Sequence, residues 1–114
     1  GSVHLAVVDP GVGTARRALA AERDGHRFVG PDNGLLTPVL DGARVVELAV
    51  PADASPTFHG RDVFAPAAAR LACGTALEQL GPPVADPRRA PLPAPRREAD
   101  GRVIGEVLYI DHYG

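Results

Sequence analysis

Residues 18–29 read ALAAERDGHRFV and predict a β-hairpin. Two short strands, Ala18 to Glu22 and Arg27 to Val29, flank the connection Arg23-Asp24-Gly25-His26. An Asp-Gly pair favours the tight turns that join antiparallel strands, because both central residues of such a turn adopt a positive φ. We therefore expect two paired strands early in the chain.

The segments around this hairpin predict a layered α/β fold. Residues 3–8 are nearly all apolar, as in a parallel strand covered on both faces, and residues 45–48 form another short strand. The turn PDNG at 31–34 offers Asp and Asn side chains to cap a short helix over 35–40. Residues 61–73 have apolar side chains at helical spacing, with a proline in an early turn and a glycine after the end.

The composition changes sharply near residue 82. Residues 82–97 hold six prolines and four arginines, which is typical of a stiff, exposed linker rather than of a core. A new strand is predicted from Val103 to Asp111. We therefore divide the chain into residues 1–81, part of an α/β domain; 82–101, a Pro/Arg-rich linker; and 102–114, the start of a second, truncated domain.

Charge and length exclude several classes of function. A net charge of −2 over 114 residues disfavours nucleic-acid or membrane-surface binding through bulk charge, and no apolar run is long enough to cross a bilayer. The absence of lysine, with an excess of arginine, suggests a bacterial gene rich in G and C. We expect one modest domain with little core to spare.

The single cysteine and the histidines argue against a metal centre. Cys73 has no partner for a disulfide or a thiolate zinc site, which suits a reducing cytoplasm, and its setting at a predicted helix end favours a buried thiol. His4, His26 and His112 lack companions at metal-ligand spacing. No metal site and no cofactor are predicted.

Two loops contain the residue types of an active site. The first, DPGVGTAR, places Asp9 at the tip of a strand and Arg16 a short distance further on; it lacks the third glycine of a dinucleotide fingerprint and the Gly-Lys of a phosphate loop. In the second, His59 lies in a glycine turn before a helix, where imidazole can take part in ligand or proton chemistry. A surface ion pair between Asp9 and Arg16 is the structural alternative.

Four stretches in order resemble the S-adenosylmethionine hydrolases (adenosine-forming), also described as S-adenosylmethionine hydroxide adenosyltransferases, which are related to fluorinase and chlorinase. They are VDPGVGT (8–14) followed by Arg16, GPDNGLL (30–36), TFHGRDVFAP (57–66) and YIDHYG (109–114). The resemblance implies an α/β N-terminal domain followed by a β-barrel domain, of which 102–114 would be the first strand. It also implies a homotrimer with active sites between subunits.

The resemblance assigns roles to particular residues. It implies a catalytic triad of Asp9, Arg16 and His59, in which water or hydroxide attacks the ribose 5′ carbon of S-adenosylmethionine and methionine leaves. Arg16 would favour hydroxide, His59 would accept or relay the proton, and Asp9 would orient both. The resemblance also implies four substrate-binding residues: Thr14, Phe58, Asp111 and Tyr113, the last two from a neighbouring subunit. It implies no cofactor.

Two other functions stay open on the sequence. A non-catalytic remnant would keep the fold and an affinity for adenosyl compounds without turnover. A halogenase of this fold would carry a small or hydroxyl-bearing residue in place of Asp9 and a tyrosine type of motif in place of His59. The residues at these two positions favour the hydrolase.

Overall fold

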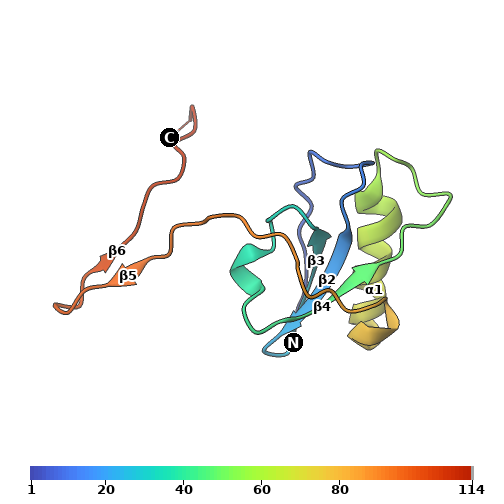
Figure 1. The fold of residues 1–114 in the computed structure, drawn as a ribbon, viewed down its shortest axis with the longest axis horizontal. Helices are drawn as coiled ribbons and strands as arrows, with labels where there is room; N and C mark the ends of the chain where they lie inside the picture. The colour runs from blue at the N-terminus through green and yellow to red at the C-terminus, as the bar shows by residue number, and fades with distance from the viewer. Residues whose placement is uncertain (114) are drawn as a thin grey trace.

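The computed structural model describes residues 1–113, which form one small α/β layer structure with an extended C-terminal segment (Figure 1). Its sheet has the strand order β1-β3-β2-β4. The strands are β1 (Val3–Leu5), β2 (Ala18–Arg23), β3 (His26–Pro31) and β4 (Arg44–Leu48). β1 is parallel to β3, whereas β2 is antiparallel to both β3 and β4.

The predicted hairpin is confirmed as β2 and β3. Asp24 and Gly25 join the two strands with φ values of 51° and 76°, the left-handed conformation that this type of turn requires. Like β3, β2 has a neighbour on each side and is an interior strand, and Ala18 to Ala21 are all buried. Its two faces therefore contact two separate apolar clusters.

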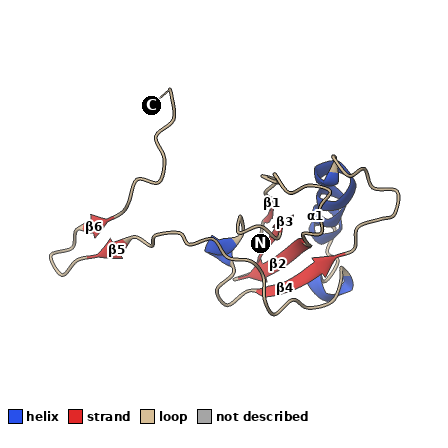
Figure 2. Cartoon of the chain, turned by 45° about the horizontal axis from the view of Figure 1, so that its top comes forward, coloured by secondary structure: helices blue, strands red, loops and turns tan. Residues whose placement is uncertain are grey.

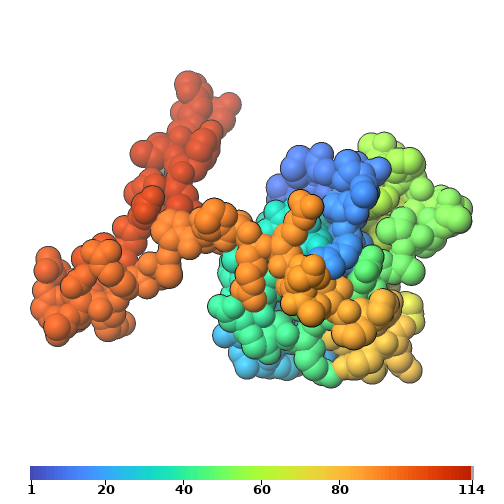
Figure 3. Space-filling view, in the orientation of Figure 1, coloured from blue at the N-terminus to red at the C-terminus, as the bar shows by residue number. Residues whose placement is uncertain are grey.

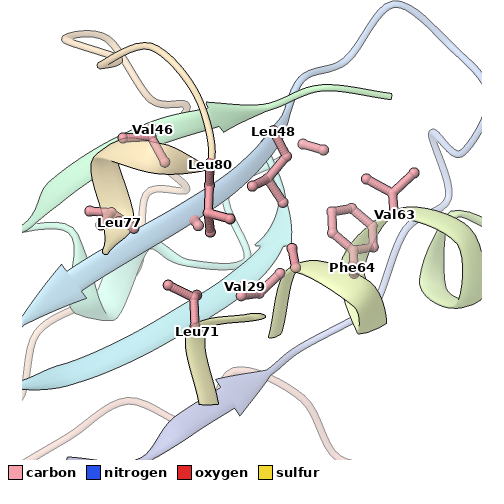
Figure 4. Packing of buried hydrophobic residues seen from close by; sticks show 11 residues of the cluster. Val29, Val46, Leu48, Val63, Phe64, Leu71, Leu77 and Leu80 are labelled. Atoms are coloured by element: carbon pink, nitrogen blue, oxygen red, sulfur yellow. The ribbon is translucent and has the colours of Figure 1, made fainter. Parts of the chain in front are cut away.

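The main core lies between the sheet and α1 (Ala65–Ala72) (Figures 2 and 4). The strands contribute Val29, Val46 and Leu48 to this cluster. The helical side contributes Val63, Phe64, Ala67, Leu71, Leu77 and Leu80, the last two from and beside the short 3-10 helix η3 (Leu77–Gln79). A second cluster on the opposite face holds Leu19, Ala21, Leu36, Leu40 and Val45.

Several predicted elements differ from the structure. The strand expected over 3–8 ends at Leu5, and it is an edge strand, because it pairs with β3 alone among the strands described. It is not covered on both faces: Val3 packs against the main core, but His4 and Leu5 are exposed. The short helix over 35–40 shrinks to a 3-10 turn, η1 (Thr37–Val39). The predicted helix over 61–73 begins with one π-helical turn, η2 (Gly60–Phe64). Cys73 is exposed rather than buried, because it follows the last turn of α1.

The first part of the predicted linker is mostly exposed, yet it is bound to the sheet domain (Figure 3). Glu47 N donates to Pro82 O, and Val84 N donates to Val45 O, both at 2.9 Å, so that residues 82–84 lie along β4. Ala90 N donates to Thr37 Oγ1 at 2.7 Å. Hydrogen bonds therefore fix a segment whose composition alone predicts only stiffness.

Beyond this attached part the chain extends away from the sheet (Figures 1 and 3). A two-stranded ribbon pairs β5 (Arg96–Arg97) with β6 (Val103–Ile104). The strand expected from 103 to 111 thus ends at Ile104, and the apolar side chains of Val107 to Ile110 are exposed. The domain boundaries at 81 and 101 stay predictions.

The core contacts give a test of stability. Leu71 is fully buried against the sheet, so Leu71→Ala is expected to lower the free energy of unfolding by about 2–5 kcal/mol in urea titrations. Leu92, which is 46% exposed, is the matched control, and Leu92→Ala is expected to change that free energy by less than about 0.5 kcal/mol. Equal effects of the two substitutions would contradict this assignment of the core.

Candidate active site

Three side chains that are distant in sequence form one buried hydrogen-bonded cluster. Asp9 follows β1, Arg16 precedes β2, and His59 directly precedes η2. Arg16 Nε donates to Asp9 Oδ1 at 3.0 Å, Arg16 Nη2 donates to Asp9 Oδ2, and Arg16 Nη2 lies 2.9 Å from His59 Nδ1. Asp9 and Arg16 thus form the ion pair that the structural alternative expects, but the pair is buried and not on the surface. Each of the two side chains is 5% exposed, and His59 is 6% exposed.

The Arg16 contact decides which nitrogen of His59 is protonated. A guanidinium has only donors, so His59 Nδ1 must accept the hydrogen bond from Arg16 Nη2. A neutral imidazole has one protonated nitrogen, which places the His59 proton on Nε2. His59 thus offers a donor, rather than a lone pair, on the side away from Arg16.

The Arg16 guanidinium has one further donor group. Its carbon lies 5.3 Å from the centre of the Phe64 ring, a distance at which a cation is stabilised by the aromatic face. Arg16 Nη1 is buried and finds no hydrogen-bond partner among residues 1–113. The cluster therefore holds a charged NH₂ group whose two N–H donors have no partner among the described residues.

The first loop is shaped by its own backbone and by the second loop. Thr14 Oγ1 donates to Gly11 O at 2.6 Å, and Val12 N donates to Asp9 O at 3.1 Å. Gly13 has a φ of 76°, and a Cβ there would lie 2.6 Å from Pro56 O. Only glycine allows the two loops to approach this closely, which is how Arg16 comes to reach His59.

The second loop is held by Asp62, in the π-helical turn. Asp62 Oδ2 accepts a hydrogen bond from Ser55 N at 2.8 Å, and Asp62 Oδ1 accepts one from Arg61 Nε at 2.6 Å. These contacts, first with Arg61 and then with Ser55, lower the pKa of Asp62 to about 2. Asp62 is therefore ionised at neutral pH and fixes the chain that leads to His59.

The predicted substrate contacts Thr14 and Phe58 lie on these same loops. Phe58 is 55% exposed, with the Arg61 guanidinium carbon 4.9 Å from its ring centre. Thr14 and Arg16 line a surface cavity of about 560 Å³, together with Arg17, Glu47 and neighbouring residues of β4 and the linker. The structure thus brings five of the predicted site residues to two adjacent loops.

Asp111 and Tyr113 are not part of this cluster. Both lie on the C-terminal segment that extends away from the sheet, where the Tyr113 side chain is 95% exposed and Tyr113 N donates to Asp111 Oδ1 (Figure 1). Gly114, the last residue of the predicted motif, lies outside the described residues. The substrate contacts expected from these two residues stay predictions.

The sequence predicts that Asp32 and Asn33 both cap the following helical turn, but their hydrogen bonds differ from this prediction. Asp32 does not cap the helical turn: it is buried, and it accepts hydrogen bonds from Arg17 Nε and from Arg88 N. Asn33 Oδ1 does accept from Leu35 N as a cap would, but Asn33 Nδ2 also donates to Val8 O at 2.8 Å. These partners lie far away in sequence, so no local pattern indicates them.

Residues 1–113 contain neither a metal-binding cluster nor a membrane-spanning helix. No group of three or more His, Cys, Asp or Glu side chains there has the arrangement of a metal site. No helix in the described part of the chain has the length and apolar character needed to cross a membrane.

Residues 1–81 match the model of the SAM hydroxide adenosyltransferase N-terminal domain. An (R)-S-adenosyl-L-methionine hydrolase of Salinispora tropica is 54% identical, over 99% of this chain and 47% of its own length. A fluorinase of Actinopolyspora mzabensis is 32% identical, over 97% of this chain and 42% of its own. The crystal structure of an uncharacterized conserved protein from Thermotoga maritima superimposes with a TM-score of 0.80 at 40% identity, over 98% and 45% of the two chains. The chain thus spans about half the length of these relatives.

The tautomer of His59 is directly measurable. Nitrogen-15 NMR of the histidine rings at alkaline pH is expected to show a protonated Nε2 and an unprotonated Nδ1 for His59, because Nδ1 accepts from Arg16. Arg16→Met removes this donor and is expected to return His59 toward a mixture of tautomers. A protonated Nδ1 in the wild type would contradict the described geometry.

The hydrogen bonds of Asp62 predict a pH dependence. The pKa of Asp62 falls from 3.8 to about 2 on folding, so its contribution to stability is complete above pH 3.8 and is lost as the pH falls through about 2. Wild type is therefore expected to exceed Asp62→Asn in unfolding free energy at neutral pH, with the difference shrinking below pH 3.8. A difference that is independent of pH would show that the carboxylate charge has no part in it.

Proposed function

This chain belongs to the SAM hydroxide adenosyltransferase family, and on that premise we propose that, within its complete reading frame, it hydrolyses S-adenosylmethionine to adenosine and methionine. Water or hydroxide attacks the ribose 5′ carbon, the bond from that carbon to sulfur breaks, and methionine leaves as a neutral thioether. One observation supports the proposal above all: Asp9, Arg16 and His59 converge from two loops in one buried cluster.

The chemistry of the leaving group determines what the protein must supply. A sulfonium departs without protonation, so neither a general acid nor a redox or metal cofactor is needed for that step. The difficult part is to align a nucleophilic oxygen with the 5′ carbon and to remove its proton. Positioned acid–base groups typically contribute about 10²–10⁴-fold to a rate, and alignment adds to this.

The hydrogen bonds of the cluster support a division of roles. Arg16 Nη1 is the donor that binds the nucleophilic oxygen and favours its hydroxide form. The resemblance implies that His59 accepts or relays the proton, but Arg16 occupies its Nδ1, so we assign His59 instead to orienting the oxygen through Nε2–H. Asp9, whose carboxylate has lone pairs beyond those bound to Arg16, accepts the proton that the attacking water loses and then passes it to solvent.

The remaining predictions concern the complete assembly. We propose that Thr14 and Phe58 contact the adenosyl group from this subunit. In a homotrimer with sites between subunits, Asp111 would bind the methionine ammonium and Tyr113 would pack on adenine from a neighbour; both project away from the sheet, which suits such an exchange. A cytoplasmic location is also part of this proposal.

Product analysis tests the proposal. Protein from the complete reading frame is incubated with S-adenosylmethionine and chloride, and the products are separated by chromatography. Adenosine and methionine are expected; a halogenated deoxyadenosine would instead indicate a halogenase, and unchanged substrate a remnant. Asp9→Ala and His59→Ala are each expected to lower kcat by at least about tenfold. His59→Ala is expected to keep the fold, whereas Asp9→Ala also lowers stability, because it leaves the Arg16 charge buried without its partner.

A surface ion pair supplies the control for these variants. Asp41 pairs with Arg89, and the Asp41 side chain is 84% exposed, whereas the Asp9 side chain is 5% exposed. Asp41→Ala is expected to keep wild-type kcat. Wild-type turnover in Asp9→Ala or His59→Ala would refute the assignment of the triad.

A further inference from the structure

The loop that carries Asp9 and Arg16 leaves the sheet early on its N-terminal side. The last hydrogen bond from this side to β3 is that of Ala6 N with Val29 O at 2.9 Å. Val8, next to Asp9, lies beyond it, and its side chain is largely exposed. The backbone that positions the Asp9 carboxylate therefore depends on a contact from outside the strand pairing.

Asn33 provides that contact. Its Nδ2 donates to Val8 O at 2.8 Å, while its Oδ1 accepts from Leu35 N at 3.1 Å. Because the amide uses its donor in one direction and its acceptor in the other, a flip would break both bonds. The side chain is held in one orientation even though the residue itself is exposed.

The turn from which Asn33 acts is itself fixed. Its neighbour Asp32 is 3% exposed, and the Asp32 carboxylate accepts from Arg17 Nε at 2.8 Å and from Arg88 N at 2.6 Å. Arg17 also binds Asp86 Oδ1 at 2.9 Å and Asp86 O at 2.8 Å. Asn33 thus extends from a turn that is anchored to the residue after Arg16 and to the linker.

We propose that Asn33 is a positioning residue for the reaction, which acts on Asp9 through the carbonyl of Val8. The inference rests on the proposed function, since it takes Asp9 as part of the catalytic triad. Asn33 holds the beginning of the loop, and the anchored turn beside it holds the end at Arg17. A shift of the loop would misalign both the carboxylate and the guanidinium that it binds.

The variant Asn33→Asp tests the hydrogen bond to Val8 O without removing the hydrogen bond that shapes the turn. The aspartate keeps an acceptor for Leu35 N but loses the donor to Val8 O. In protein from the complete reading frame we expect kcat to fall at least about tenfold, with KM for S-adenosylmethionine changed less than about threefold, because misalignment costs the chemical step rather than binding. Asp41→Asn, which removes the charge of an exposed side chain paired with Arg89 and changes no contact of Asn33, is the matched control and is expected to keep wild-type kcat.

A second readout does not require turnover. The Arg16 Nε–H resonance, which reports the hydrogen bond to Asp9 Oδ1, is expected to shift in Asn33→Asp and to stay unchanged in Asp41→Asn. Asn33→Ser, which keeps a short acceptor without a charge, replaces Asn33→Asp if thermal unfolding shows that the latter does not fold.

The two readouts distinguish failure of this inference from failure of the proposed function. An inactive wild type would refute the hydrolase, and the Arg16 resonance alone would then decide whether Asn33 positions the loop. With an active wild type, an unshifted resonance or an unchanged kcat in the Asn33 variant would overturn the proposal.

Discussion

The buried ion pair of Arg16 with Asp9 is the interaction on which the rest of the site depends. Both side chains are 5% exposed, and removing two charges from water costs more than a surface pair would return. The structure meets this cost with two hydrogen bonds between the partners, an acceptor at His59 Nδ1 and the face of Phe64. Asp9, His59 and Phe64 must therefore all contact the Arg16 guanidinium, and the conformations of the two loops bring them there.

Both regular and irregular backbone position the side chains of the site. The sheet and the Asn33 side chain hold the two ends of the first loop, while α1 packs on the sheet through Leu71 and orients the turn that precedes it. That turn is π-helical, and such turns are frequent at functional sites, where a change of helical pitch redirects a side chain. His59 is the residue immediately before this turn, so a regular α-helical start would aim the imidazole differently. Irregular geometry occurs here where the site needs it.

Sequence reasoning succeeded where short-range physics decides the outcome. The Asp24-Gly25 turn, the helical spacing before Gly74, and the two loops containing Asp9, Arg16 and His59 are visible in local patterns. It failed where tertiary contacts decide: β1 is apolar yet lies at an edge, Cys73 ends a helix but is exposed, and Asn33 has a partner 25 residues away. The attachment of the linker belongs to the same group, because proline content predicts stiffness but not a binding partner.

The path of the linker along β4 has a consequence for how the sheet meets other chains. An unpaired strand edge offers a row of donors and acceptors to any extended peptide, which makes it a starting point for aggregation. Here Pro82 and Val84 occupy that edge through hydrogen bonds with Glu47 and Val45. Pro82 and Pro83 have no backbone N–H, so the covering segment lacks donors that a further strand would need to pair with it. The segment that leads out of the domain thus also prevents the sheet from growing at its β4 edge.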